Sequence, residues 1–302
     1  MLSQTLQLST AELLGRVETF LSSLKHRRPE TRGTYQRALR QFVVWFRKDG
    51  QFRFRVDDIE RYKRYLTKHR KLSAVSVSTY LTAVRRFCQN LVDTDLLESN
   101  PAKEVSGNKR PISHSRRPLT YAETTHLLEQ IDASEERGVR DQAMIKLILG
   151  CGLSAIEIVR ANVGDIVESG DKHVLLIQGK GHDTKDAQAT LPEEAYSAVT
   201  AYLNTRTQPR ASEPLFLSAG NRYHGKRMTT RGINQRINHY LSGAGIKQSA
   251  SRRVTPYSLR HTAALMMVDA GASAEEIRER FRLGSIITAM IYVNQKGTLR
   301  KN

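Results

Sequence analysis

The chain has 302 residues and a formal charge of +18, from 48 Lys and Arg against 30 Asp and Glu. Hydrophobic residues make up 39% of it and two are cysteines, so we expect a globular protein in a reducing compartment rather than a disulfide framework. No apolar run approaches the ~18 residues of a membrane span, and the first residues lack the pattern of a secretory signal. We therefore expect a cytoplasmic protein with no membrane partner, whose charge favours nucleic acid. The plainer alternative is a merely soluble, highly charged surface.

The first part of the chain predicts an all-helical bundle, which we assign to residues 1–104. Ser9 and Glu12 form a capping box, and apolar side chains recur at helical spacing from there to Leu24. Three more amphipathic stretches follow, over residues 35–46, 57–66 and 76–91. Cys88 lies on the apolar stripe of the last stretch, so we expect it in the core.

Residues 105–118 show neither helical nor strand periodicity and contain Gly, Pro and several basic residues, which predicts a basic linker. Residues 1–110 carry +11 of the formal charge and the remaining residues carry +7. A basic linker between basic domains is suited to a phosphate backbone, and the alternative is an ordinary solvated tether. Its candidate DNA contacts are Lys109, Arg110, Arg116 and Arg117.

Residues 119–302 predict helices beside a small antiparallel sheet. A capping box of Thr120 and Glu123 starts the first helix, and Ser273 with Glu276 caps a later one. Strands are expected over 173–178 and 188–191, with the turn Gly179-Lys180-Gly181 between them. Further helices are expected over 143–150, 195–203, 233–241 and 259–270. The expected fold class is thus mainly α with a small antiparallel β-sheet.

Metal and nucleotide sites are not indicated. The nine histidines lack metal-ligand spacing and the two cysteines lie 63 residues apart. The Gly-Lys-Gly turn lacks the remaining residues of a nucleotide phosphate loop. We expect neither a metal nor a cofactor.

Four motifs of the second domain occur in a recognisable order. Gly152-Leu153-Ser154 with Glu157 comes first, the Gly-Lys-Gly turn second, and a Leu-Arg-His-Thr box at residues 259–262 third. Tyr292 follows 32 residues after Arg260. The series resembles the catalytic domain of tyrosine site-specific recombinases, the family of phage integrases and Xer-type resolvases. The first domain resembles their core-binding, SAM-like helical bundle, so the likeness covers about residues 10–295 and implies an α+β catalytic domain after that bundle.

The resemblance implies a role for each matching residue. Tyr292 fits the nucleophile, which forms a 3′-phosphotyrosine and frees a 5′-hydroxyl. Arg260 fits the second catalytic arginine, Lys180 the general acid of the β-turn, and Glu157 the acid that supports the site. The structural alternatives are a tyrosine packed on a helix, two surface cations and a helix-cap carboxylate.

The departures from the family pattern also matter. Ser154 stands where the family has its first catalytic arginine, and with Glu157 it also reads as a capping box. Tyr257 replaces a histidine but still donates a hydrogen bond. The late Gly-His pair falls on Leu283, or on Ser285 with a gap. Candidates to replace the missing cation are Arg160 first, then His261 and His182.

The sequence therefore predicts a site-specific recombinase of double-stranded DNA, slowed by the loss at Ser154. Candidate DNA contacts in the first domain are Arg37, Arg40, Arg85 and Arg86. The resemblance implies four protomers on two recombination sites, a possible accessory DNA-bending or directionality protein, and association with the nucleoid. Two alternatives stay open: a non-catalytic accessory DNA-binding protein, and a topoisomerase-like relaxase without site choice.

Overall fold

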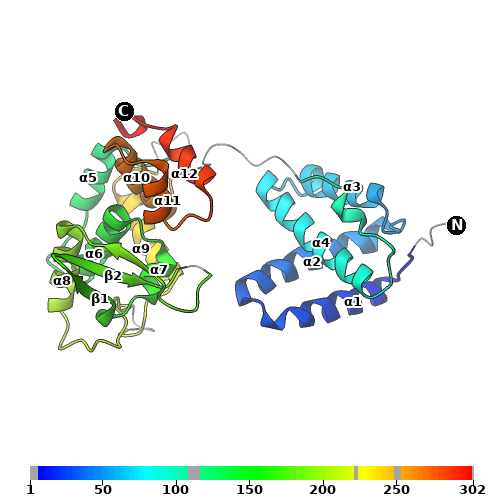
Figure 1. The fold of residues 1–302 in the computed structure, drawn as a ribbon, viewed down its shortest axis with the longest axis horizontal. Helices are drawn as coiled ribbons and strands as arrows, with labels where there is room; N and C mark the ends of the chain where they lie inside the picture. The colour runs from blue at the N-terminus through cyan, green and yellow to red at the C-terminus, as the bar shows by residue number, and fades with distance from the viewer. Residues whose placement is uncertain (1–5, 108–115, 180, 221–223, 248–252, 301–302) are drawn as a thin grey trace. The chain divides into compact units, whose positions relative to one another are not determined.

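A computed structural model describes residues 6–107, 116–179, 181–220, 224–247 and 253–300. The chain divides into two compact units, residues 1–111 and 112–302 (Figure 1). Within the described ranges, no helix is long and apolar enough to cross a membrane. Three predicted site residues, Lys109, Arg110 and Lys180, lie outside the described residues.

The first unit is built from helices α1 (Thr10–Ser23), α2 (Pro29–Asp49), α3 (Val56–Arg64) and α4 (Ala74–Asp93) (Figure 1). The predicted capping box is present, because the Glu12 N–H donates to Ser9 Oγ at 3.2 Å and the Ser9 N–H donates to Glu12 Oε2 at 2.8 Å. Helix α4 was expected to begin at Ser76 but begins two residues earlier, at Ala74. The Ser76 N–H donates to the Ser73 hydroxyl, which makes Ser73 the N-cap.

Aromatic side chains fill the core of this unit. Phe42 and Tyr62 meet edge to face with ring centroids 5.1 Å apart, and Trp45 lies 5.0 Å from Tyr62. Cys88 is fully buried in the same core, as predicted. Edge-to-face contacts of this kind add specific geometry to the burial of apolar area.

The second unit has the mixed composition that the sequence predicts. A three-stranded antiparallel sheet runs in the order β1 (Ile166–Ser169), β2 (Lys172–Ile177), β3 (Ala187–Thr190). β2 and β3 were expected and β1 was not. The helices are α5 (Tyr121–Glu129), α6 (Glu136–Cys151), α7 (Ala155–Arg160), α8 (Glu193–Asn204), α9 (Thr230–Gly243), α10 (Pro256–Asp269), α11 (Ala274–Arg280) and α12 (Ile286–Val293) (Figure 1). The predicted fold class is confirmed.

Helix α10 is buried around most of its circumference, and this decides where the site lies. Its buried residues include polar ones, among them Arg260, His261 and Thr262. Thr262 Oγ accepts a hydrogen bond of 2.8 Å from the Leu119 N–H, which ties the start of the unit to the helix. A buried helix carrying an arginine and a histidine must supply partners for both, because unpaired buried charge is costly.

Both ends of the segment 105–118 are packed. Val105 is 1% exposed in the core of the first unit. At the other end, the Arg117 guanidinium donates two hydrogen bonds of 2.6 Å to the carboxylate of Glu123 on α5. Each end is thus fixed to its own unit.

Candidate active site

Helix α10 presents Tyr257, Arg260 and His261 on one side, because residues three and four apart share a helix face. Pro256 suits the first turn of the helix, where its missing N–H has no helical partner. The Thr255 N–H donates to Ser258 Oγ at 3.1 Å and closes the N-terminus. Tyr257 is 44% exposed, whereas Arg260 and His261 are buried. Of these three side chains, that of Tyr257 reaches solvent, whereas those of Arg260 and His261 lie in the interior of the unit.

The guanidinium of Arg260 is held by main-chain and carboxylate oxygens. Its Nη1 donates to the carbonyl of Gly152 and, at 3.2 Å, to Glu157 Oε2, while Nη2 donates to the carbonyl of Phe281. Its central carbon lies 5.2 Å from the centroid of the Phe281 ring, within cation–π range. These bonds use three of the five N–H donors of a guanidinium, which leaves two for a ligand.

Glu157 is the acceptor that organises this cluster. Its Oε2 accepts from the Ser154 N–H at 2.6 Å and the Ser154 hydroxyl at 2.8 Å. Burial raises the pKa of Glu157, but the hydrogen bond and charge of Arg282, the charge of Arg260 and the Ser154 N–H outweigh it. The net pKa lies below the ordinary value, so the carboxylate is ionised at neutral pH. Ser154 has the predicted capping contact.

Arg282 is a site residue that sequence reasoning missed. It lies between α11 and α12 with φ of +50°, and its Nε donates to Glu157 Oε1 at 2.6 Å while its Nη2 donates to Oε2 at 3.1 Å. Nη1 donates to the carbonyl of Arg280 at 2.6 Å. The only sequence signal was an arginine beside Leu283, where the family pattern and this chain part.

A cavity of about 500 Å³ opens beside this cluster. Two guanidiniums, Arg260 and Arg282, and two carboxylates, Glu157 and Asp186, line it. Asp186 pairs with His182, so the cluster of Arg260, Arg282 and Glu157 by itself has a formal charge of +1. Its lining consists of Ser154, Ile156, Glu157, Gly179, His182, Asp186, Ala187, Tyr257, Arg260, Phe281 and Arg282. An oxyanion is the ligand that such a group of donors suits.

Tyr292 lies on α12 and is 3% exposed. Its hydroxyl is 2.6 Å from Nδ1 of His261, and its ring centroid is 6.5 Å from that of Phe281. Burial and the neighbouring Tyr257 raise the pKa of the phenol, against a lowering by Arg260. The phenol is therefore protonated at neutral pH and needs a base for nucleophilic chemistry.

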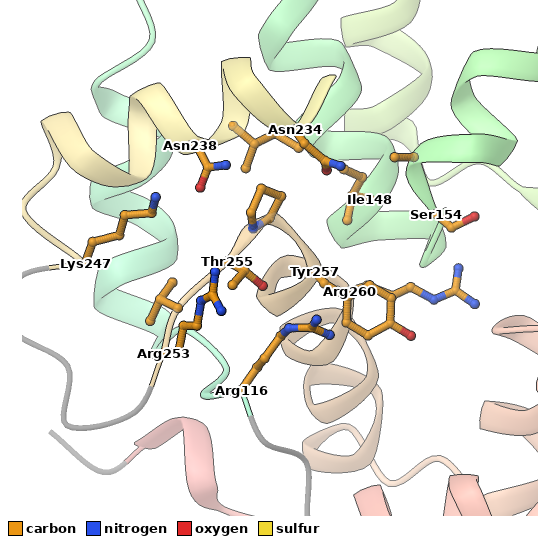
Figure 2. A pocket seen from close by; sticks show the side chains of 14 residues that line it. Arg116, Ile148, Ser154, Asn234, Asn238, Lys247, Arg253, Thr255, Tyr257 and Arg260 are labelled. Atoms are coloured by element: carbon orange, nitrogen blue, oxygen red, sulfur yellow. The ribbon is translucent and has the colours of Figure 1, made fainter. Parts of the chain in front are cut away.

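A second pocket of about 460 Å³ adjoins the first, since both are lined by Ser154, Tyr257 and Arg260. Figure 2 shows Arg116 and Arg253 reaching into it near α10, with Lys247 across the pocket. The Arg116 guanidinium carbon lies 5.2 Å from the centroid of the Tyr257 ring. Cations with an exposed aromatic ring make a surface that suits a nucleic-acid backbone.

Comparison with known proteins identifies the family. A model described as the phage integrase family matches residues 117–298, and one described as the phage integrase N-terminal SAM-like domain matches residues 13–98. The chain belongs to the phage integrase family. The resemblance inferred from the sequence is thereby confirmed for both domains.

Relatives of this integrase-family chain span nearly its whole length. It is 30% identical over 299 residues to tyrosine recombinase XerC of Leptospira interrogans serovar copenhageni, covering 95% of this chain and 91% of that protein. It is 28% identical to XerC of Escherichia coli O127:H6, with coverage of 91% and 89%. Its fold is similar to XerH bound to a palindromic difH substrate, with a TM-score of 0.74, 18% identity and coverage of 97% and 83%. It is also similar to a lambda integrase dimer bound to a core site, with a TM-score of 0.69 and 14% identity, covering 95% of this chain and 96% of that chain.

The remaining predicted residues fall in several places. Arg160 donates to the carbonyls of Gly179 at 2.6 Å and Gln178 at 3.5 Å, at the end of β2, and is not among the residues that line the 500 Å³ cavity. Ser285 Oγ accepts from the Ile287 N–H and caps α12, and the partly buried Leu283 packs against the core cluster. His182 Nδ1 pairs with Asp186 at the cavity wall.

The predicted DNA contacts of the first unit differ in their surroundings. Arg37, Arg40 and Arg86 are exposed. Arg85 is half-buried, and its guanidinium donates to the carbonyls of Ala102 at 2.8 Å and Val105 at 2.5 Å. Arg85 therefore holds the end of its own domain in place.

Proposed function

We propose that this protein is a site-specific tyrosine recombinase that cuts and rejoins DNA with Tyr292 as nucleophile. The observation that carries the proposal is the paired Arg260 and Glu157 at the cavity, with the Tyr292 hydroxyl bonded to His261 on the same helix as Arg260. The rings of Tyr292 and Phe281 are neighbours, and the Phe281 ring also contacts Arg260. Family membership and the XerC relatives support the same reaction class.

The proposed reaction follows from these groups. Tyr292 Oη attacks the scissile phosphorus, an O–P bond forms, and the bond from phosphorus to the 5′-oxygen breaks. His261 Nδ1 lies where it accepts the phenol proton. Arg260 stabilises the negative charge that develops on the phosphate oxygens. Lys180 remains our prediction for the acid that protonates the leaving 5′-oxygen. The freed 5′-hydroxyl of one strand then attacks the phosphotyrosine of another: a new bond from phosphorus to the 5′-oxygen forms, the bond from phosphorus to Tyr292 Oη breaks, and the phenol regains a proton. The number of phosphodiester bonds is conserved, so the DNA strand is rejoined without an external energy source.

Ser154 stands, in this proposal, at the position of the first catalytic arginine of the family. Its hydroxyl is occupied with Glu157 and contributes no positive charge. Loss of one such donor costs about 10²–10³ in rate. Unless another guanidinium takes its place, cleavage by this protein is slow.

Double-stranded DNA is the proposed partner, gripped partly through charge. The exposed Arg37, Arg40 and Arg86 and the pocket cations Arg116 and Arg253 supply phosphate contacts. Such contacts release counterions, so binding weakens steeply with salt. We also propose a tetramer on two sites, an accessory DNA-bending or directionality protein, and association with the nucleoid, all from the family resemblance.

The test is covalent capture on a nicked duplex. The site is first selected by the wild-type protein from a random-sequence duplex library. A nick a few nucleotides to the 3′ side of the cleavage position lets the short fragment that bears the free 5′-hydroxyl diffuse away, so rejoining cannot occur. We expect a covalent protein–DNA band with wild type and none with Tyr292→Phe. Tyr196→Phe is the matched control, because Tyr196 is half-buried on α8 and stacks on His173. A band that survives Tyr292→Phe contradicts the assignment of the nucleophile.

A second candidate function is non-catalytic DNA binding as an accessory protein. The observation that favours it is the near-complete burial of Tyr292 in a chain whose position 154 lacks a cation. Specific DNA binding by wild type without any covalent band selects this candidate. Relaxation of supercoiled plasmids without sequence preference instead selects a topoisomerase-like relaxase.

A further inference from the structure

Position 154, at the cavity wall, carries an uncharged serine where the family pattern has a cation. Ser154 is the N-cap of α7 and directs both its N–H and its hydroxyl to Glu157 Oε2. A family member with arginine there carries its cation at the N-terminus of this helix. In this chain, any second cation beside Arg260 has to come from another element.

Arg282 reaches that location from the loop between α11 and α12. Its Nη2 lies 3.1 Å from Glu157 Oε2, the oxygen that also contacts Arg260 Nη1 at 3.2 Å. The same two arginines also donate to one carbonyl, that of Gly152. Both guanidiniums line the 500 Å³ cavity. One carboxylate and one carbonyl thus hold them side by side.

We propose that Arg282 supplies the guanidinium missing at Ser154 and stabilises the scissile phosphate together with Arg260. The inference rests on the proposed recombinase function. It makes Arg282 a catalytic residue, delivered from a loop that follows α11 instead of from the start of α7.

The geometry of Arg282 supports this role. A side chain that is 15% exposed is desolvated enough for its charge to act strongly, yet it reaches the cavity. Its bonds use four of five N–H donors, which leaves one for a phosphate oxygen. The left-handed backbone at a non-glycine residue is uncommon, and such conformations persist at functional sites where surrounding contacts hold them.

Arg160 was the replacement expected from the sequence, and its contacts differ. Its guanidinium donates to the carbonyls at the end of β2, where the turn with Lys180 begins. Those bonds give it a positioning role for the turn. Of the two arginines, Arg282 is the one whose donors meet Glu157 and line the cavity with Arg260.

The test compares Arg282→Ala with the double variant Ser154→Arg, Arg282→Ala on the nicked duplex described above. We expect Arg282→Ala to slow adduct formation by a factor of about 10²–10³. We expect the double variant, with arginine restored at position 154, to form the adduct at least about ten times faster than Arg282→Ala. Arg210→Ala is the matched control, because Arg210 is an 82% exposed arginine paired with Glu213 outside the cavity. Arg160→Ala tests the rival position. Circular dichroism shows whether each variant is folded.

A second readout needs no cleavage. The affinity of each variant for the selected duplex is measured across salt concentrations in the Tyr292→Phe background. The logarithm of affinity falls with the logarithm of salt concentration, and removing one phosphate contact makes this slope less steep by about 0.9. We expect this change for Arg282→Ala and none for Arg210→Ala.

The outcomes distinguish failure of the role proposed for Arg282 from failure of the proposed recombinase function. Wild-type cleavage with an unchanged rate for Arg282→Ala overturns the inference and leaves the proposed function standing. Absence of cleavage by wild type overturns the proposed function, and the salt slope then decides on Arg282 alone. An unchanged slope in that case refutes its contact with phosphate. Loss of cleavage that Ser154→Arg does not recover, with an unchanged slope, assigns Arg282 a purely structural role and overturns the inference as well.

Discussion

Glu157→Gln is the substitution that most directly probes how the site is held together. The change keeps the shape of the side chain and removes its charge. Glu157, Arg260 and Arg282 have side chains that are 4%, 10% and 15% exposed, so the two guanidiniums stay largely buried without their counter-charge. Removing one partner of a buried ion pair costs about 3–5 kcal/mol.

We take the lower end of that range, about 3 kcal/mol, because glutamine retains one acceptor oxygen. For a domain of the size of the second unit, each kcal/mol shifts the melting temperature by about 2–4 °C, so we expect a drop of about 6–12 °C. Thermal unfolding followed by circular dichroism measures it. The control is Glu279→Gln, an exposed position on α11, with an expected change within about 0.5 kcal/mol.

The stabilisation that the Glu157 carboxylate provides depends on pH, and the direction of this dependence can be predicted. The folded pKa of Glu157 lies below its ordinary value of 4.5, so the unfolded chain takes up this proton first as the pH falls. The stabilisation is complete above 4.5 and is lost as the pH falls through the folded pKa. The gap in melting temperature between wild type and Glu157→Gln must therefore narrow below pH 4.5. An equal gap at neutral and acid pH, or no gap at neutral pH, refutes the reasoning.

Two further predictions concern stability. Gly152→Ala places a Cβ 2.6 Å from Phe281 Cε1 at a φ of +61°, so we expect the free energy of unfolding in chemical denaturation to fall by about 2–5 kcal/mol. The control is Gly170→Ala, where φ is +63° and the space around the Cβ is open. An equal fall for the two variants shows that the Phe281 contact contributes nothing. Arg85→Ala loses two carbonyl contacts and should destabilise the first unit by about 1–3 kcal/mol, whereas the exposed Arg86→Ala should leave its melting temperature unchanged and weaken DNA binding in a filter assay. Identical effects of the two arginine variants contradict this division.

Local signals in the sequence predicted much of the fold. The capping residues at Ser9, Thr120 and Ser273 mark helix starts that the structure contains. The strand β1 was missed because its four residues, two apolar and then two polar, do not alternate, whereas the equally short β3 does; β1 is recognisable only through its pairing with β2. The start of α4 was displaced because Ser73 and Ser76 are both plausible caps.

The candidate site was predicted where a motif is contiguous and missed where it is assembled in space. Arg260, Glu157 and Ser154 were found from short motifs, and the structure brings them together. Arg282 was not found because its contacts with Glu157 span 125 residues of sequence, and no spacing rule links an irregular loop to a helix cap. Arg160 was favoured because it shares a helix with Glu157, but helix spacing does not specify that its side chain turns to the end of β2.

Two of the three acceptors that hold the Arg260 guanidinium belong to the main chain, and this has an evolutionary consequence. The carbonyls of Gly152 and Phe281 are present whatever side chains the sequence carries, so point mutations do not delete them. The cradle for a guanidinium can thus persist while the arginine that fills it changes its place in the gene. A lineage that loses the arginine at one end of such a cradle remains a single substitution away from recovering the charge through a neighbouring loop. If Arg282 has the role proposed for it, a comparison of aligned positions alone would miss the second cation of this site.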